Sequence, residues 1–96
     1  MNIDLVARDV VINEEVHGRV EQKLERIMER TQMETPARIT VENNKGRYVA
    51  SITLHVKGRE IVAQAEEKNM VAAIDEAIEK ADRQFKKHQE KMQTKR

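Results

Sequence analysis

The sequence predicts an α+β fold with the element order βαβββα, in which two helices pack side by side on one face of a four-stranded mixed sheet. Four segments alternate apolar and polar residues with the period of a strand, and two longer segments repeat apolar residues with the period of a helix. The polar alternate positions of the strands mark one sheet face as solvated. Both apolar helix stripes must therefore cover the other face.

The first two elements are expected over residues 2–8, which alternate as a half-buried strand does, and over residues 14–31, which form a helix. Asn13 is a suitable N-cap for this helix, and the two acidic residues after it suit the positive end of the helix dipole. Gly18 lies inside the helix at a cost of about 1 kcal/mol relative to Ala. We interpret it as tolerated or closely packed, with little functional weight.

Three strands and a second helix follow the break at Pro36. A strand joined to the next through a helix should run parallel to it, and hairpins add antiparallel partners. Turn residues stand at 43–46 and 57–60, where Gly58 can take the positive φ of a tight hairpin. The strands are expected over residues 37–43, 47–57 and 60–66, and the helix over residues 70–92.

Composition limits the function classes. The 96 residues suit one domain, expected over 1–92, with a short basic tail at 93–96. Lys and Arg number 18 against 17 Asp and Glu, so the distribution of charge has to indicate any nucleic-acid partner. The absence of cysteine excludes disulfides and thiolate chemistry, and without a leader or membrane span we expect a cytoplasmic protein. Tyr48 and Phe85 are too few for a base-stacking platform, so any RNA contact must be largely to backbone and shape.

Each predicted helix carries four basic residues along one stripe. At about 100° per residue, the first set falls within an arc of roughly 60° and the second within roughly 80°. If both stripes point the same way, they form one electropositive surface that suits a phosphate backbone. The stripes consist of Arg19, Lys23, Arg26 and Arg30 in the first helix and of Lys80, Arg83, Lys87 and Lys91 in the second.

Ordinary charge patterning is the alternative interpretation of each stripe. Glu15 and Arg19, like Glu76 and Lys80, stand four apart, so such pairs can support their own helix at a few tenths of a kcal/mol each. A solvated helix face needs no binding partner. Two such stripes in one small domain favour a binding surface.

The sequence contains no residue pattern typical of a catalytic or metal-binding site. The three histidines stand far apart without a second ligand at metal spacing, and no phosphate loop, nucleophile elbow or Cys-His pair is present. We interpret Asp75 and Asp82 as solvated helix residues rather than an acid-base pair. The sequence therefore predicts a protein that is not an enzyme and needs no cofactor or small-molecule substrate.

One resemblance covers essentially the whole chain. The stretch from Asn69 to Asp75, followed by Lys80, Arg83-Gln84 and Lys87-His88, resembles the last helix of the short ribosome hibernation promoting factors. That family also includes the ribosome-associated inhibitor once called a sigma-54 modulation protein. The stretch Leu54-His55-Val56-Lys57-Gly58 is similar to its third strand and turn. Two positions depart from the family: Val71 stands where Tyr is usual, and Asn69 where Asp is frequent.

The resemblance implies a stationary-phase or stress factor that binds the small subunit of the 70S ribosome. There it would occupy the mRNA and A- and P-site tRNA channel and silence translation by occlusion. The short basic end favours the short type, whose relatives favour ribosome dimers with help from another small factor. Family members place basic helix residues against small-subunit rRNA, which correspond here to Lys23, Arg26, Lys80, Arg83 and Lys87; Arg19, Arg30, Lys86 and Lys91 are added from the stripes alone.

Two other functions stay open at this point. The αβββα part of the predicted order is similar to that of double-stranded RNA-binding domains, whose contacts are largely shape-specific. A regulatory module that binds an acidic protein partner through its basic face is the second alternative.

Overall fold

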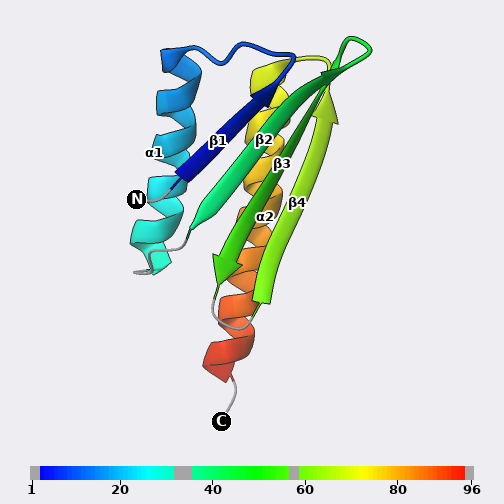
Figure 1. Cartoon of the computed structure of the whole chain (residues 1–96). Coiled ribbons are helices and arrows are strands. Elements are labelled where there is room, and N and C mark those ends of the chain that lie inside the picture. Colours follow the sequence, from blue (N-terminus) through cyan, green and yellow to red (C-terminus); the bar gives the residue numbers. More distant parts are fainter. Residues whose placement is uncertain (1–2, 32–35, 57–58, 95–96) are drawn as a thin grey trace.

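The computed structural model describes residues 3–31, 36–56 and 59–94, and its element order is the βαβββα that the sequence predicts (Figure 1). The predicted fold class is confirmed, and most element boundaries lie within two residues of those expected. The elements are β1 (Ile3–Arg8), α1 (Glu14–Thr31), β2 (Ala37–Asn44), β3 (Arg47–Val56), β4 (Arg59–Glu67) and α2 (Met70–Thr94).

The four strands form one sheet in the order β1-β2-β3-β4. β1 pairs with β2 in parallel, and the other neighbours pair antiparallel, as predicted. Lys45 and Gly46 form the two-residue turn between β2 and β3, both with positive φ (54° and 84°), which is the backbone of a type I′ hairpin. The Gly46 N–H donates to Asn43 Oδ1 at 3.1 Å. The predicted turn at Lys57-Gly58 lies outside the described residues.

Both helices begin at an asparagine cap. Asn13 Oδ1 accepts the Val16 N–H at 2.9 Å, which confirms the predicted N-cap of α1. Asn69 Oδ1 accepts the Ala72 N–H at 3.1 Å at the start of α2. The amide of Asn69 therefore supplies the acceptor oxygen that an Asp would supply in its place.

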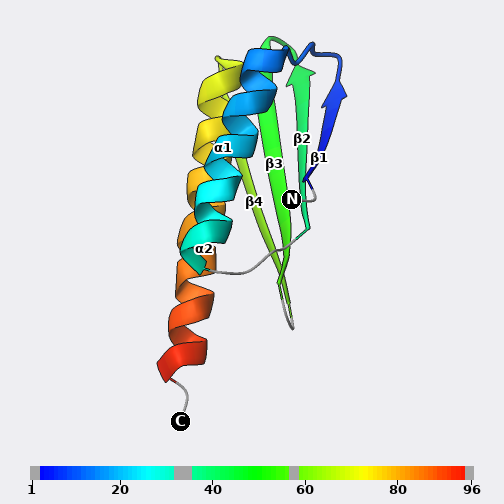
Figure 2. The same cartoon turned by 90° about the vertical axis from the view of Figure 1, so that its left-hand side faces the viewer.

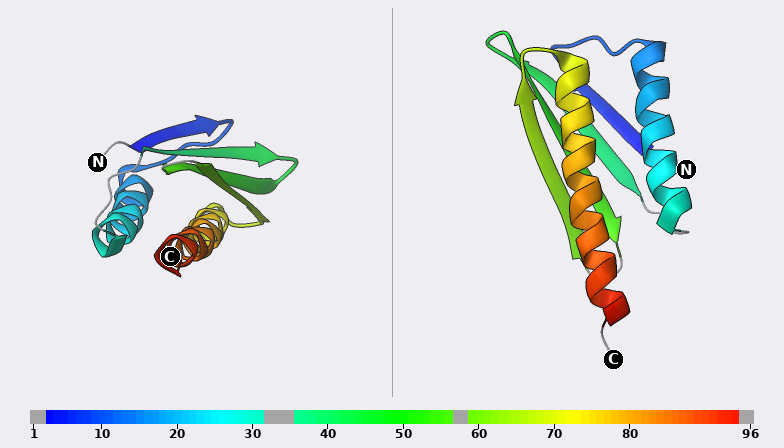
Figure 3. Two further views of the ribbon diagram at one scale, coloured as in Figure 1. Left: turned by 90° about the horizontal axis from the view of Figure 1, so that it is seen from below. Right: turned by 180° about the vertical axis from the view of Figure 1, so that it is seen from behind.

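Both helices cover the same face of the sheet (Figures 2 and 3). Their apolar stripes and the inward-facing strand residues form a single core, in which Phe85 is the largest fully buried side chain. Three alanines of α2 are also buried, and such small side chains let this helix lie close to the strands. They are Ala73, Ala77 and Ala81. Burial of one stripe per helix fixes which flank of each helix faces its neighbour.

The two helices run in the same direction, from top to bottom in Figure 1. The first turns of α1 therefore lie beside the first turns of α2. α2 is the longer helix and extends past the end of the sheet (Figures 1 and 3). Because its helical backbone continues to Thr94, residues 93 and 94 of the expected tail are helical.

Candidate nucleic-acid interface

The candidate cations lie on the layer formed by the two helices. Where their side chains are described, all are exposed or half-buried. They are Arg19, Lys23 and Arg26 on α1 and Lys80, Arg83, Lys86 and Lys87 on α2. The side chains of Arg30 and Lys91, also predicted for this surface, lie outside the described residues.

The α1 stripe faces α2 and meets a carboxylate there. Arg19 donates from Nε to Asp75 Oδ1 at 3.2 Å and from Nη2 to Asp75 Oδ2 at 2.8 Å. The Nζ of Lys23 lies 3.1 Å from Asp75 Oδ1. One acidic side chain of α2 thus holds two cations of α1.

Asp75 is therefore not the solvated helix residue that the sequence indicated. Its side chain is only 22% exposed because it lies between the two helices. The hydrogen bond from Arg19 lowers the pKa of Asp75 below its usual 3.8, and Lys23 adds to this against the opposing effect of burial. The same hydrogen bond raises the pKa of Arg19. Asp75 is ionised at neutral pH and is part of the candidate interface.

The α2 stripe begins on the other flank of its helix, beside the edge strand β4. Lys80 donates from Nζ to the carbonyl oxygen of Gln64 at 3.1 Å, and its Nζ lies 3.6 Å from Glu76 Oε1. One turn further along, Gln84 donates from Nε2 to the carbonyl oxygen of Val62 at 3.1 Å. These two side chains cover backbone acceptors that an edge strand would otherwise present to water or to another chain.

The two stripes share one layer, but acidic residues stand among them. Asp82 Oδ2 lies 3.7 Å from the Nζ of Lys86, as Asp75 lies against Arg19 and Lys23. The helical wheels suggested one uninterrupted electropositive surface, whereas the structure places Asp75 and Asp82 among its basic residues.

Three cations remain outside these internal pairs. Among the residues that the structure describes, Arg26, Arg83 and Lys87 make no ion pair, and all three are exposed. An incoming anion can contact them without breaking a bond within the protein. Of the described candidate cations, these three are therefore the most available to bind an anion.

A pair of carboxyl groups lies near the start of α2. A hydrogen bond with Glu76 raises the pKa of Glu67, and the same bond lowers the pKa of Glu76. Both groups are exposed or half-buried, and Lys80 is nearby. No described group of three or more His, Cys, Asp or Glu residues is placed to hold a metal ion.

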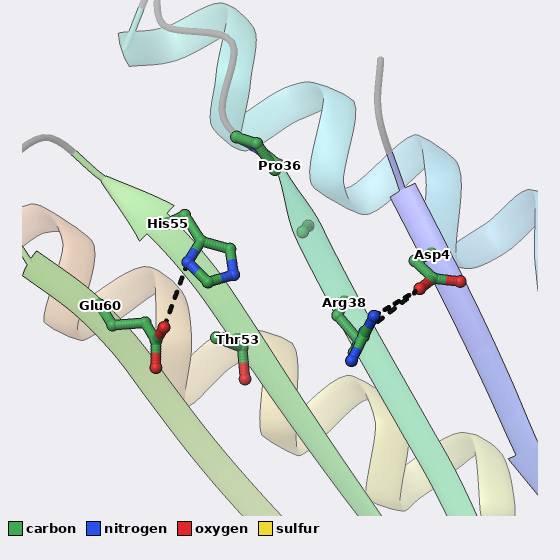
Figure 4. A pocket seen from close by; sticks show the side chains of 7 residues that line it. Asp4, Pro36, Arg38, Thr53, His55 and Glu60 are labelled. Atoms are coloured by element: carbon green, nitrogen blue, oxygen red, sulfur yellow. Dashed lines mark hydrogen bonds and ion pairs between the residues drawn. The ribbon is translucent and has the colours of Figure 1, made fainter.

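The helix-free face of the sheet carries a separate open hollow of about 470 Å³ (Figure 4). Arg38 Nη2 lies 3.1 Å from Asp4 Oδ2 there, and His55 Nδ1 lies 3.2 Å from Glu60 Oε2. Because Arg38 faces a carboxylate and Glu60 adds a second acidic side chain, this hollow offers an anion less attraction than the helical layer. It contains no residue that the sequence predicted for the site.

No helix in the described part of the chain combines the length and apolar character needed to cross a lipid bilayer.

The features above define a class of small α+β domains whose exposed chemistry is a cation-rich helical layer. The sequence profile described as Sigma 54 modulation protein / S30EA ribosomal protein matches residues 3–93, and the chain belongs to that family. The resemblance inferred from the last helix is thus confirmed. Proteins of this family are not enzymes, which also confirms the prediction of a non-catalytic chain.

Two relatives are similar to this chain in sequence over nearly its full length. The ribosome hibernation promoting factor of Pseudomonas putida is 33% identical over 94 residues, which are 98% of this chain and 92% of that protein. The Escherichia coli K12 protein of the same name is 32% identical over 92 residues, covering 96% and 97% of the two chains.

Two solved structures have the same fold. The N-terminal domain of Thermus thermophilus Protein Y matches with a TM-score of 0.83 and 27% identity, over 92% of this chain and 99% of that one. A ribosomal subunit interface protein from Coxiella burnetii matches with a TM-score of 0.84 and 26% identity, over 93% and 98%.

Proposed function

We propose that this chain is a cytoplasmic ribosome hibernation factor that binds rRNA of the small subunit through its helical layer. In stationary phase or under stress it would occupy the mRNA and tRNA channel and silence translation by occlusion. The observation that carries the proposal is the exposed set of cations on that layer, with Arg26, Arg83 and Lys87 outside any described ion pair. Relatives that are named for ribosome hibernation support it.

The chemistry of binding follows from the side chains available. Phe85 is 1% exposed and Tyr48 is half-buried, so these rings cannot provide a base-stacking platform. Recognition would then depend on phosphate contacts by Lys and Arg and on the fit of the helical layer to the folded rRNA. Occlusion needs no covalent step, and a wash at high salt would release the protein and restore activity.

A reversal of charge on each face of the domain tests where rRNA binds. Arg83→Glu with Lys87→Glu should abolish co-sedimentation with small subunits. The matched control is Arg38→Glu with Arg47→Glu, which reverses the same number of positive charges on the helix-free face, where both residues pair with carboxylates. The control should keep most of the binding, and circular dichroism should show that both variants fold. Equal loss in both pairs would contradict the assignment to the helical layer.

Competition tests occlusion itself. Two ligands that exclude each other must weaken each other's binding by the same factor. mRNA and initiator tRNA placed on the subunit beforehand should therefore reduce binding of this protein, and the protein should reduce tRNA binding in return. Simultaneous saturation of one subunit by both would contradict the proposal. Isolated duplex RNA that bound as tightly as small subunits would instead favour a free double-stranded RNA binder.

Sedimentation of a stationary-phase lysate tests the ribosomal state. We propose that the protein favours ribosome dimers together with a second small factor, so it should migrate with the dimer fraction. Its presence only with single 70S particles would contradict dimer promotion and leave occlusion standing.

A further inference from the structure

Asp75 is placed where a purely electrostatic RNA-binding surface would not have an acid. It stands between the helices and accepts three contacts from Arg19 and Lys23, at 2.8 to 3.2 Å. Both cations belong to the surface predicted to bind rRNA. Within this group of three side chains one of the two positive charges is neutralised, so α1 attracts a polyanion less strongly than its basic stripe suggests.

The donors that Asp75 does not use remain available. A guanidinium has five N–H donors and an ammonium has three. Asp75 takes the Nε donor of Arg19, one N–H of its Nη2 and one N–H of Lys23. Both N–H donors of Nη1 and the second one of Nη2 remain on Arg19, and two donors remain on Lys23. Because the carboxylate fixes both side chains, these remaining donors point in set directions.

We propose that Asp75 determines the RNA specificity of this surface: it weakens the attraction of α1 for arbitrary RNA and aims the remaining donors of Arg19 and Lys23 at one phosphate position. The inference rests on the proposed function and deepens it. An RNA that presents a phosphate at that position meets donors that are already ordered, which avoids the entropic cost of fixing them. A flexible RNA meets a reduced net charge and a repelling carboxylate, which is how an interface disfavours wrong partners.

The position of the carboxylate supports this role. It is 22% exposed, so it lies close enough to the surface to act on an approaching phosphate. Its lowered pKa keeps it charged at neutral pH, since the hydrogen bond from Arg19 favours the ionised form. Glu79 lies one turn further along α2 and is exposed. It offers a matched site for the same change of charge without a described contact to α1.

The test compares Asp75→Asn with Glu79→Gln, using poly(U) and purified small ribosomal subunits as the two probes. Freeing Arg19 and Lys23 from their ion pairs should tighten binding of Asp75→Asn to poly(U) by about two- to twentyfold. The log-log salt slope should steepen by about 0.7 to 1.4, for one or two more phosphate contacts to a single strand. Binding to small subunits should stay equal or weaken, so the ratio of the two affinities falls. Glu79→Gln should change both affinities by less than about twofold.

The remaining outcomes separate the two proposals. If Asp75→Asn changed both affinities by the same factor, or neither, the specificity role would be wrong. If the wild type bound subunits no tighter than poly(U), the proposed function would fail, whereas the poly(U) comparison would still report on Asp75. Asp75→Glu keeps the charge and should bind poly(U) within about twofold of the wild type. Poly(U) binding by Asp75→Glu as tight as that of Asp75→Asn would indicate a packing role instead and overturn the inference.

Discussion

Binding to small subunits should depend steeply on salt, because the candidate contacts are cations meeting phosphates. Each phosphate contact releases counterions, so the logarithm of the affinity falls with the logarithm of the salt concentration by about 0.7 to 0.9 per contact. The structure sets limits on the number of contacts. Seven candidate cations have described side chains, and four of them are paired with carboxylates inside the protein.

These numbers give a measurable range. Three contacts, from the unpaired cations alone, would weaken binding about 20- to 40-fold between about 50 and 200 mM salt. Seven contacts would weaken it about 900-fold or more. We expect about five, because paired cations contribute only in part; the slope is then about −3.5 to −4.5 and the loss roughly 130- to 500-fold.

Equilibrium sedimentation with purified small subunits at four or more salt concentrations measures this slope. Arg83→Glu with Lys87→Glu provides the reference at low salt, where residual binding should already be small. An affinity that changed less than about tenfold over this range would refute a mechanism based on phosphate contacts.

Two further predictions concern the folded state. Gly18→Ala should raise the free energy of unfolding by about 1 kcal/mol and the melting temperature by about 4 to 8 °C, because Ala is the better helix former. The added Cβ meets nothing within 4 Å. A lower melting temperature in circular dichroism would contradict this prediction. Asp75 should stabilise the fold at neutral pH and stop doing so in acid, because its folded-state pKa lies below the usual 3.8 and its ion pairs are lost as the pH falls through that lowered value. The free energies of urea unfolding of the wild type and Asp75→Asn should therefore differ at about pH 7, by about 1 kcal/mol or less per pair, and converge once the pH lies below the lowered pKa of Asp75. A difference that stayed constant with pH would contradict the role of the ion pairs.

Local chemistry made most of the fold predictable. The cap at Asn13 and the start of α1 follow from one side chain and its neighbours, and the bounds of α1 are those expected. Lys45-Gly46 likewise forms its turn within four residues. The periodicity of apolar residues and the chemistry of turns act over short stretches of chain. The pattern of residues was therefore enough to predict the helices, strands and turns.

The site was less predictable because its contacts join distant parts of the chain. Asp75 lies 56 positions from Arg19, and Lys80 lies 16 positions from the carbonyl that it covers. A helical wheel gives the direction of a side chain relative to its own helix core, but it does not place the neighbouring helix or strand. Asp75 stood in the quoted last-helix motif, yet only the packing of α1 against α2 could give it Arg19 and Lys23 as partners.

The parallel pairing of β1 has a consequence for the order in which the molecule folds and opens. Asp4 lies opposite Arg38, 34 positions later, whereas partners in the β3–β4 hairpin are only 3 to 19 positions apart. The longer loop costs more entropy to close, and this edge strand is at most half-buried. We expect the three-stranded meander and α2 to form first and β1 to join last. Amide hydrogens of β1 should accordingly exchange with solvent before those of the central strands.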